Sequence, residues 1–346
     1  MLFESGEYTD AIKQYLHLIQ TDSGEAQRGF KARVIIARLR NNELGAADKD
    51  VASFSKKYKP TDEESSSFEL ERGSYFFRKA DYTNARKSFE KVESKYDESA
   101  SAPEAMYWLG KISEVLNKPL DAIKIFQNLQ KSYPNAPVMQ RVHLSLGNIY
   151  FNAEKLDDAI KNYKIIVDNP DADREILPFA MSNLINTYEV AGANDAALNL
   201  TRKYIDGYPN NEDTFDKRIK IGILYQRLGY NEQSVLHLQS LLDQAGSDLE
   251  GELRYYIGEG YFNKGDFQQA ILEFLKVPYL VTKKGKVDWT ANALYMSGQS
   301  YEKMGRFDQA LTMYKQILER SGIDETFKAA ARKEIDRVQL VLKKPN

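Results

Sequence analysis

Small residues recur along the whole chain at intervals of 36 to 40 residues, and this spacing limits the possible fold more than any other feature. The recurring residues are eight alanines and one serine: Ala11, Ala47, Ala85, Ala122, Ala159, Ala197, Ser234, Ala270 and Ala310. A fixed interval of this length is typical of stacked supersecondary units. The 346 residues therefore hold about nine copies of one unit instead of two or three separate globular domains.

In the clearest copies a glycine precedes the small residue by twelve positions. These glycines are Gly110, Gly147, Gly222, Gly258 and Gly298. Glycine inside a helix costs about 1 kcal/mol relative to alanine, so it is expected where another part of the chain must come close. The pattern predicts two antiparallel helices per repeat, with the glycine on the first helix and the alanine on the second. We expect the two backbones to approach closely at these small residues.

The turns and helix ends also follow the repeat. Gly192, Gly229, Gly265 and Gly305 stand where the first helix ends and are expected to adopt a positive φ. Pro134 and Pro209 are expected to close second helices. Two copies have lost the glycine, and they have Ile35 and Ile185 in its place. The stacking is predicted to be irregular in those two repeats.

This pattern resembles the tetratricopeptide family, whose helix–turn–helix units of about 34 residues stack into a right-handed superhelix. The resemblance implies an all-α fold, a right-handed α-solenoid of about nine repeats over residues 1–322, with a capping helix and tail over residues 323–346. The segments 105–110 and 132–137 are also similar to bacterial cell-envelope repeat proteins, such as the Tol-Pal-associated coordinator of cell division and the lipoprotein of the outer-membrane barrel-assembly machine.

The two ends of the sequence differ in pattern. The glycine position of the first repeat would precede Met1, so the first repeat is predicted to be truncated and the native chain to extend further at its N-terminus. Its uncovered apolar residues could also support self-association. At the other end, Phe327, Ala331, Ile335, Val338 and Leu342 fall on one face of a predicted capping helix.

Two connections stand out from the repeat. The polar segment 59–67 is predicted to interrupt a helix, as an ordinary loop or as a hinge between two halves of the solenoid. The segment from Pro278 to Trp289 has Lys283, Lys284 and Lys286 at its tip. It is interpreted as a solvated loop or as a contact for an acidic partner or anionic lipid.

The sequence has no pattern typical of catalysis or of a cofactor or metal site. It has no cysteine, and its three histidines, His17, His143 and His237, are more than ninety residues apart. With 48 basic against 50 acidic residues there is no general basic excess for nucleic acid. No apolar run approaches the roughly 18 residues of a membrane span. We therefore predict a non-enzymatic protein without cofactors.

The resemblance implies that one face of each first helix lines a concave groove. Counted from the packing glycine, this face contains the residues six and three before it and one and four after it, which share one side of a helix. From this face we predict the partner-binding residues Tyr107, Lys111, Asn148, Phe151, Phe179, Asn186, Tyr255, Phe262 and Tyr295. Glu104, Glu114, Glu189, Asp216, Glu252, Glu259 and Glu302 make this face acidic overall.

The predicted function is a protein-interaction scaffold that binds an extended partner segment, neutral to basic and bearing apolar side chains. The narrower resemblance favours a periplasmic or outer-membrane-associated role in cell-envelope assembly. Two alternatives remain open at this point. One is a cytoplasmic adaptor, and the other is the regulatory repeat region of a larger protein with an upstream catalytic domain.

Overall fold

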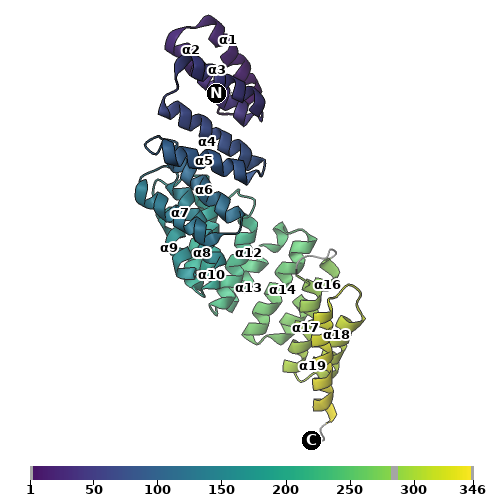
Figure 1. The fold of residues 1–346 in the computed structure, drawn as a ribbon. Coiled ribbons are helices and arrows are strands. Elements are labelled where there is room, and N and C mark those ends of the chain that lie inside the picture. The colour runs from purple at the N-terminus through teal and green to yellow at the C-terminus, as the bar shows by residue number, and fades with distance from the viewer. Residues whose placement is uncertain (1–2, 282–286, 344–346) are drawn as a thin grey trace. The chain divides into compact units, whose positions relative to one another are not determined.

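A computed structural model describes residues 3–281 and 287–343, and every regular element in those ranges is helical (Figure 1). The fold is all-α, as predicted. The elements are α1 (Tyr8–Thr21), α2 (Gly24–Arg40), α3 (Leu44–Tyr58), α4 (Asp62–Arg78), α5 (Tyr82–Lys95), α6 (Ala102–Val115), α7 (Pro119–Ser132), α8 (Met139–Asn152), α9 (Leu156–Val167), α10 (Leu177–Val190), α11 (Asn194–Gly207), α12 (Thr214–Arg227), α13 (Asn231–Gln239), the short 3-10 helix Leu242–Gln244, α14 (Ser247–Lys264), α15 (Phe267–Phe274), α16 (Val277–Leu280), α17 (Trp289–Lys303), α18 (Phe307–Glu319) and α19 (Glu325–Lys343).

The helices group into two compact units, an N-terminal unit of residues 1–180 and a C-terminal unit of residues 181–346. First and second helices alternate along the chain, and the helices of a repeat pack together, as α4 does with α5 and α17 with α18. The first helices are α2, α4, α6, α8, α10, α12, α14 and α17. The second helices are α3, α5, α7, α9, α11, α13, α15 and α18. Helix α1 has the place of a second helix, and α19 packs on α18 as a further first helix would.

The nine recurring small residues are all buried, each on a second helix and each at most 2% exposed. The reason for the glycines differs from the prediction. A Cβ added at Gly110 or Gly147 would come within 3 Å of the ring of Phe126 or Tyr163, on the second helix of the same repeat. The glycine therefore makes room for a side chain four residues after the buried alanine, and not for another backbone. The same relation holds for Gly73 with Phe89, Gly222 with Leu238, Gly258 with Phe274 and Gly298 with Tyr314.

The two repeats without the glycine have the same helix pair, but the larger side chain is on the first helix and the smaller one is on the second. Ile185 and Thr201 occupy the positions of a glycine and its ring, and both are fully buried. In the repeat of Ile35, the corresponding second-helix residue is Val51, which packs against the core cluster that contains Ile35. A larger residue on the first helix is matched by a smaller one on the second, so these repeats retain regular helix pairs.

Each turn from a first to a second helix has the same hydrogen-bonded closure. At Gly229, φ is +80°, its N–H donates to the carbonyl of Gln226, and the next N–H donates to the carbonyl of Tyr225. This is the Schellman arrangement of a helix end. The positive φ predicted for the four turn glycines is confirmed. The other four turns place Asn42, Ala80, Asn117 and Glu154 at the same position.

The polar segment 59–67 is mostly helical, so its predicted extent as a break is wrong. Helix α4 begins at Asp62 because Thr61 and Glu64 form a capping box: the Thr61 hydroxyl accepts from the Glu64 N–H at 3.2 Å, and the Glu64 carboxylate accepts from the Thr61 N–H at 2.9 Å. The connection from α3 is reduced to residues 59–61. A hinge at this place stays a prediction.

The segment from Pro278 to Trp289 begins inside the one-turn helix α16, where the Pro278 carbonyl accepts a hydrogen bond from Arg320 at 3.0 Å. The basic tip around Lys283 lies outside the described residues. At the C-terminal end, Ala331, Ile335 and Val338 of α19 are buried, in agreement with a capping helix. Leu342, predicted on the same apolar face, is 48% exposed instead.

Candidate partner-binding surface

We use the name inner stripe for the face of the first helices that is predicted to bind a partner. It consists of the residues six and three before the packing position and one and four after it. On α4 three of these four residues, Ser67, Leu70 and Ser74, line cavities. The stripe is therefore hollowed in this part of the N-terminal unit.

Two cavities of about 440 and 430 Å³ lie over α2, α4 and the start of α6. The first is lined by Tyr8, Arg40, Leu70, Glu71, Ser74, Arg78, Glu104 and Trp108. The second is lined by Phe3, Glu4, Tyr15, Arg33, Ile36, Arg40, Ser67, Leu70 and Glu71. The sequence reasoning missed both, because it applied the inner-stripe offsets only from Gly110 onward. Counted from Gly73, the same offsets give Ser67, Leu70 and Ser74.

The charged residues of these cavities balance each other. The Arg40 guanidinium donates to Glu71 with an Nε–Oε1 distance of 2.9 Å and lies 4.8 Å from the ring centroid of Phe3. Arg78 donates to the carbonyl of Leu39 at 2.9 Å. The cavities thus combine arginine, carboxylate and aromatic surfaces without a strong excess of either sign.

Ion pairs join consecutive first helices of the N-terminal unit. Arg28 of α2 donates to Glu64 of α4 with an Nε–Oε1 distance of 2.8 Å, and this bond lowers the pKa of Glu64. Arg141 of α8 donates to Glu104 of α6 with an Nη1–Oε1 distance of 2.9 Å. Both pairs hold neighbouring repeats together, because opposite charges in partly buried positions attract more strongly than in water. Only Arg141 and Glu104 belong to the inner stripe.

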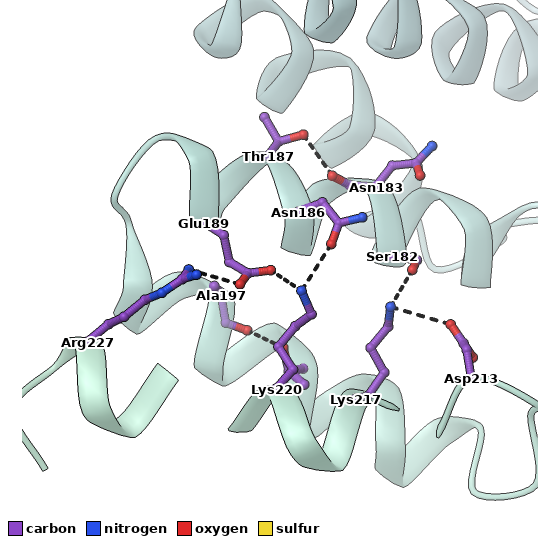
Figure 2. A network of polar contacts seen from close by, with 11 residues as sticks. Ser182, Asn183, Asn186, Thr187, Glu189, Ala197, Asp213, Lys217, Lys220 and Arg227 are labelled. Atoms are coloured by element: carbon purple, nitrogen blue, oxygen red, sulfur yellow. Dashed lines mark hydrogen bonds and ion pairs between the residues drawn. The ribbon is translucent and has the colours of Figure 1, made fainter. Parts of the chain in front are cut away.

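A similar network joins α10 and α12 in the C-terminal unit (Figure 2). The Glu189 carboxylate pairs with Lys220 and, at 3.0 Å, with the Arg227 guanidinium. The buried Lys217 donates to the Ser182 hydroxyl at 2.6 Å and lies 3.4 Å from the Asp213 carboxylate.

At the end of this unit, Arg337 of α19 pairs with Glu302 of α17 at 2.6 Å. Glu302 also accepts from the Tyr314 hydroxyl at 2.6 Å. The last first-helix junction of the described chain is therefore joined by opposite charges, like the junctions described above.

The stripe of α14 has a different electrostatic character. Burial raises the pKa of Glu252, and the nearby charge of Asp216 raises it further. Burial also raises the pKa of Glu259, against the lowering effect of Arg227. Burial together with these carboxylates raises the pKa of Tyr256 to about 12. Burial is the largest cause of all three pKa shifts.

Several predicted binding residues are engaged within the protein. Tyr107 is only 9% exposed, and its ring contacts Phe126 and the Arg141 guanidinium. Lys111 pairs with Glu114 on its own helix. A partner would have to displace these contacts to reach either residue.

The amides and the phenylalanines of the stripe differ in exposure. Asn148 accepts from the Tyr163 hydroxyl at 2.7 Å, and the Asn186 oxygen accepts from Lys220 at 3.3 Å. Both amides are exposed. Phe179 is 63% exposed, and Phe151 is half-buried. Phe179 is therefore the predicted aromatic that is most accessible to a partner.

The predicted aromatics of the C-terminal unit are half-buried. The Tyr255 ring packs 5.2 Å from Trp289, and the Phe262 ring packs 5.3 Å from Phe267, measured between centroids. The Tyr295 hydroxyl donates to Glu334 of α19 at 3.0 Å. Each presents only part of its side chain to solvent.

His143 and His237 each make their own hydrogen bond within the fold. His143 bonds to the Asn162 amide at 3.0 Å, and His237 bonds to the carbonyl of Arg218 at 2.8 Å. Within residues 3–281 and 287–343, no three His, Cys, Asp or Glu side chains are grouped to hold a metal ion. None of the described helices combines the length and apolar content that a membrane span requires.

Two stretches of the sequence match family models of the tetratricopeptide repeat, residues 70–137 in the N-terminal unit and residues 292–321 in the C-terminal unit. These two stretches are therefore similar to tetratricopeptide repeats, and such repeats form protein-interaction scaffolds. The all-α helix pairs described above agree with this family.

Solved structures with similar folds include a tetratricopeptide repeat protein from Parabacteroides merdae. It has 15% sequence identity and a TM-score of 0.47, and the match covers 78% of this chain and 98% of that one. Another is PilW, a type IV pilus biogenesis factor, with 13% identity, a TM-score of 0.46 and coverage of 66% and 97%. Comparison with curated proteins finds no match.

Proposed function

We propose that this protein is a non-enzymatic scaffold that binds an extended segment of a partner protein along the inner stripe of its first helices. The observation that supports it best is the pair of cavities over α2, α4 and α6, because they lie on the stripe and are lined by aromatic, arginine and carboxylate side chains. Such a lining suits a peptide, whose backbone needs donors and acceptors and whose side chains need apolar surface.

The partner segment is proposed to be neutral to basic, with apolar side chains. Leu70 and Trp108 in the first cavity, and the exposed Phe179 on α10, offer apolar surface to such side chains. The half-buried carboxylates of α14, Glu252 and Glu259, favour a segment without strong negative charge.

A role in cell-envelope assembly is the favoured setting, on the resemblance of segments 105–110 and 132–137 to envelope repeat proteins. A cytoplasmic adaptor, or the regulatory repeats of a larger protein, are the alternatives. Fractionation of the tagged protein in its native organism separates these settings, since an envelope role requires the protein in the envelope fraction.

Site-specific photo-crosslinking in the native organism tests the binding surface. A benzophenone amino acid replaces Ser74 in the first cavity or, as a control, Gln127, an exposed residue on the second helix α7. We expect one partner segment to crosslink at Ser74 and not at Gln127. Crosslinking at Gln127 alone would place partner binding on the second helices and overturn the proposal.

A further inference from the structure

Arg141 binds to a carboxylate and an aromatic ring of the inner stripe in the preceding repeat. Its guanidinium donates to Glu104 and lies 4.6 Å from the ring centroid of Tyr107. Glu104 and Tyr107 are six and three residues before Gly110, and Arg141 is six residues before Gly147 in the next repeat. A carboxylate and an aromatic ring one helical turn apart thus form a receptor for a guanidinium, which gains both an ion pair and a cation–π contact.

The same receptor occurs on α14 without its cation. Glu252 and Tyr255 are six and three residues before Gly258, as Glu104 and Tyr107 are before Gly110. The position that Arg141 fills is occupied on α17 by Asn292, whose amide donates to the carbonyl of Asp288 at 3.0 Å. In the described part of the chain, no cation pairs with Glu252, and its pKa is raised by burial.

The preceding repeat adds a second negative charge instead of a positive one. Asp216 of α12 lies close enough to Glu252 for its charge to raise the pKa of that carboxyl. The α6–α8, α10–α12 and α17–α19 junctions each bring a cation to a carboxylate of the stripe. At the junction of α12 with α14, Arg227 acts on Glu259, whereas the charge that acts on Glu252 is the carboxylate of Asp216. Two neighbouring carboxylates are unfavourable unless a cation from elsewhere binds there.

Aromatic rings surround Tyr255, the ring of this receptor. The Tyr107 ring contacts Trp108, Phe126 and the Arg141 guanidinium. The Tyr255 ring contacts Tyr256, Phe274 and Trp289 in the corresponding way. Trp289 is the third neighbour of the Tyr255 ring. Tryptophan is the aromatic side chain that attracts cations most strongly.

We propose that an arginine or lysine side chain of the partner protein binds at Asp216 and Glu252, beside Tyr255 and Trp289, and supplies the cation that Arg141 supplies in the N-terminal unit. This inference rests on the proposed function, because it assigns the basic residue of the partner segment to one junction. The guanidinium relieves the repulsion of the two carboxylates and contacts the ring surface. An acidic segment would add to the repulsion at this site.

A peptide series tests the charge selection. Three fluorescein-labelled twelve-residue peptides share their apolar residues and differ only in having arginine, glutamine or glutamate at the remaining positions. We expect fluorescence anisotropy to show the arginine peptide binding the full chain about tenfold more tightly than the glutamine peptide, and the glutamate peptide more weakly than either.

Two double variants with the same change in charge locate the binding. Asp216→Asn with Glu252→Gln should weaken the arginine peptide about tenfold. The control, Asp206→Asn with Glu319→Gln, neutralises two exposed carboxylates on second helices and should leave the affinity within about twofold. Equal losses in both variants would show general charge attraction and overturn the proposal.

A third variant supplies the cation from within the chain. Asn292→Arg places a guanidinium where Arg141 stands in the other unit, so it should compete with the arginine peptide, weaken it about tenfold and raise the melting temperature. Asn292→Gln is the matched control and should do neither. Unchanged binding in Asn292→Arg, or no binding of the arginine peptide by the wild type, would overturn this inference. The crosslinking at Ser74 would still decide the proposed function independently.

Discussion

The two units build the same turn from different residues. In the N-terminal unit the residue of positive φ between first and second helix is Asn42, Ala80, Asn117 or Glu154. In the C-terminal unit it is a glycine in all four turns: Gly192, Gly229, Gly265 and Gly305. An L-residue in this conformation is strained by roughly 1 kcal/mol, whereas glycine is not. The packing of the helix pair therefore fixes the turn, and glycine only removes strain from it.

The units also differ in how they use the charges of the inner stripe. In the N-terminal unit Glu104 is neutralised by Arg141 from the next repeat. In the C-terminal unit Glu252, at the same place in its repeat, lies near Asp216, and the uncharged Asn292 has the sequence position that corresponds to Arg141. The first arrangement joins two repeats by an ion pair, and the second places two carboxylates close together. Under the proposal above, repeats with the same backbone divide structural and binding roles between them.

The largest expected effect tests what the two units share. Leucine at Gly147 or at Gly258 would overlap Tyr163 or Phe274, so each variant should lose about 3 kcal/mol or more of unfolding free energy through overpacking. Chemical denaturation measures the loss. The control is Gly29→Ala, because Gly29 lies in helix α2 with open space around its Cα and should gain stability. A loss confined to one unit would show that the glycine–ring pair is not a common rule.

A somewhat smaller effect is expected from exchanging the two kinds of repeat. Gly110→Ile and Phe126→Thr together reproduce the Ile185 and Thr201 pair of the other unit. Each single substitution should destabilise, by overpacking or by a cavity, and the double variant should recover about 2 kcal/mol relative to the sum of the two. A double-mutant cycle measures this coupling. Simple additivity would contradict size compensation between the helices.

Exchanging the turn residues should change stability by about 1 kcal/mol in opposite directions. Ala80→Gly removes the strain of a positive φ and should raise the unfolding free energy, partly offset by the greater entropy of the unfolded chain. Gly229→Ala introduces that strain, although the space around Gly229 is open, and should lower it. Thermal unfolding measures both. A neutral Gly229→Ala would mean that the C-terminal turns relax in a way that the N-terminal turns do not.

The smallest effect concerns the unpaired carboxylate of α14. The pKa of Glu252 is raised by burial and by Asp216, so its protonated form favours the folded state. This contribution to the unfolding free energy is fully present below the pKa of Glu252 in the unfolded chain, and it is lost as the pH rises through the pKa in the folded protein. Glu252→Gln should therefore be slightly more stable than the wild type at pH 7, and the gain should vanish near pH 4. Melting curves at both pH values measure it, with the exposed Glu319→Gln as control. A loss of stability at pH 7 would indicate that Glu252 is paired in the N-terminal manner.

The repeat allowed much of the fold to be predicted from the sequence. The buried small residues, the first and second helices, the prolines that end α7 and α11, and the C-terminal helix all follow from spacing, because a periodic core requires periodic small and apolar residues. The turns of the N-terminal unit and the early start of α4 were less visible. Ala80 and Glu154 do not identify a left-handed turn by type, and the polar segment 59–67 is as compatible with a loop as with a capped helix.

The candidate surface was only partly visible in the sequence. The inner-stripe offsets identify a face of each first helix, but they do not show which side chains are free. Tyr107 belongs to the stripe and is covered by Arg141, a residue of the next repeat. The cavities over α2 and α4 likewise depend on side chains from α1, α2, α4 and α6 together.

The sequence by itself determined the helix pair, its period and the faces that it buries, because these depend on residues within one repeat and on helical geometry. Only the tertiary structure decided what fills the space at each glycine, which carboxylates are neutralised and where the inner stripe is hollow. These properties arise between side chains roughly 15 to 40 positions apart in the chain. They depend on how particular side chains meet across packed helices, which the periodic pattern alone does not specify.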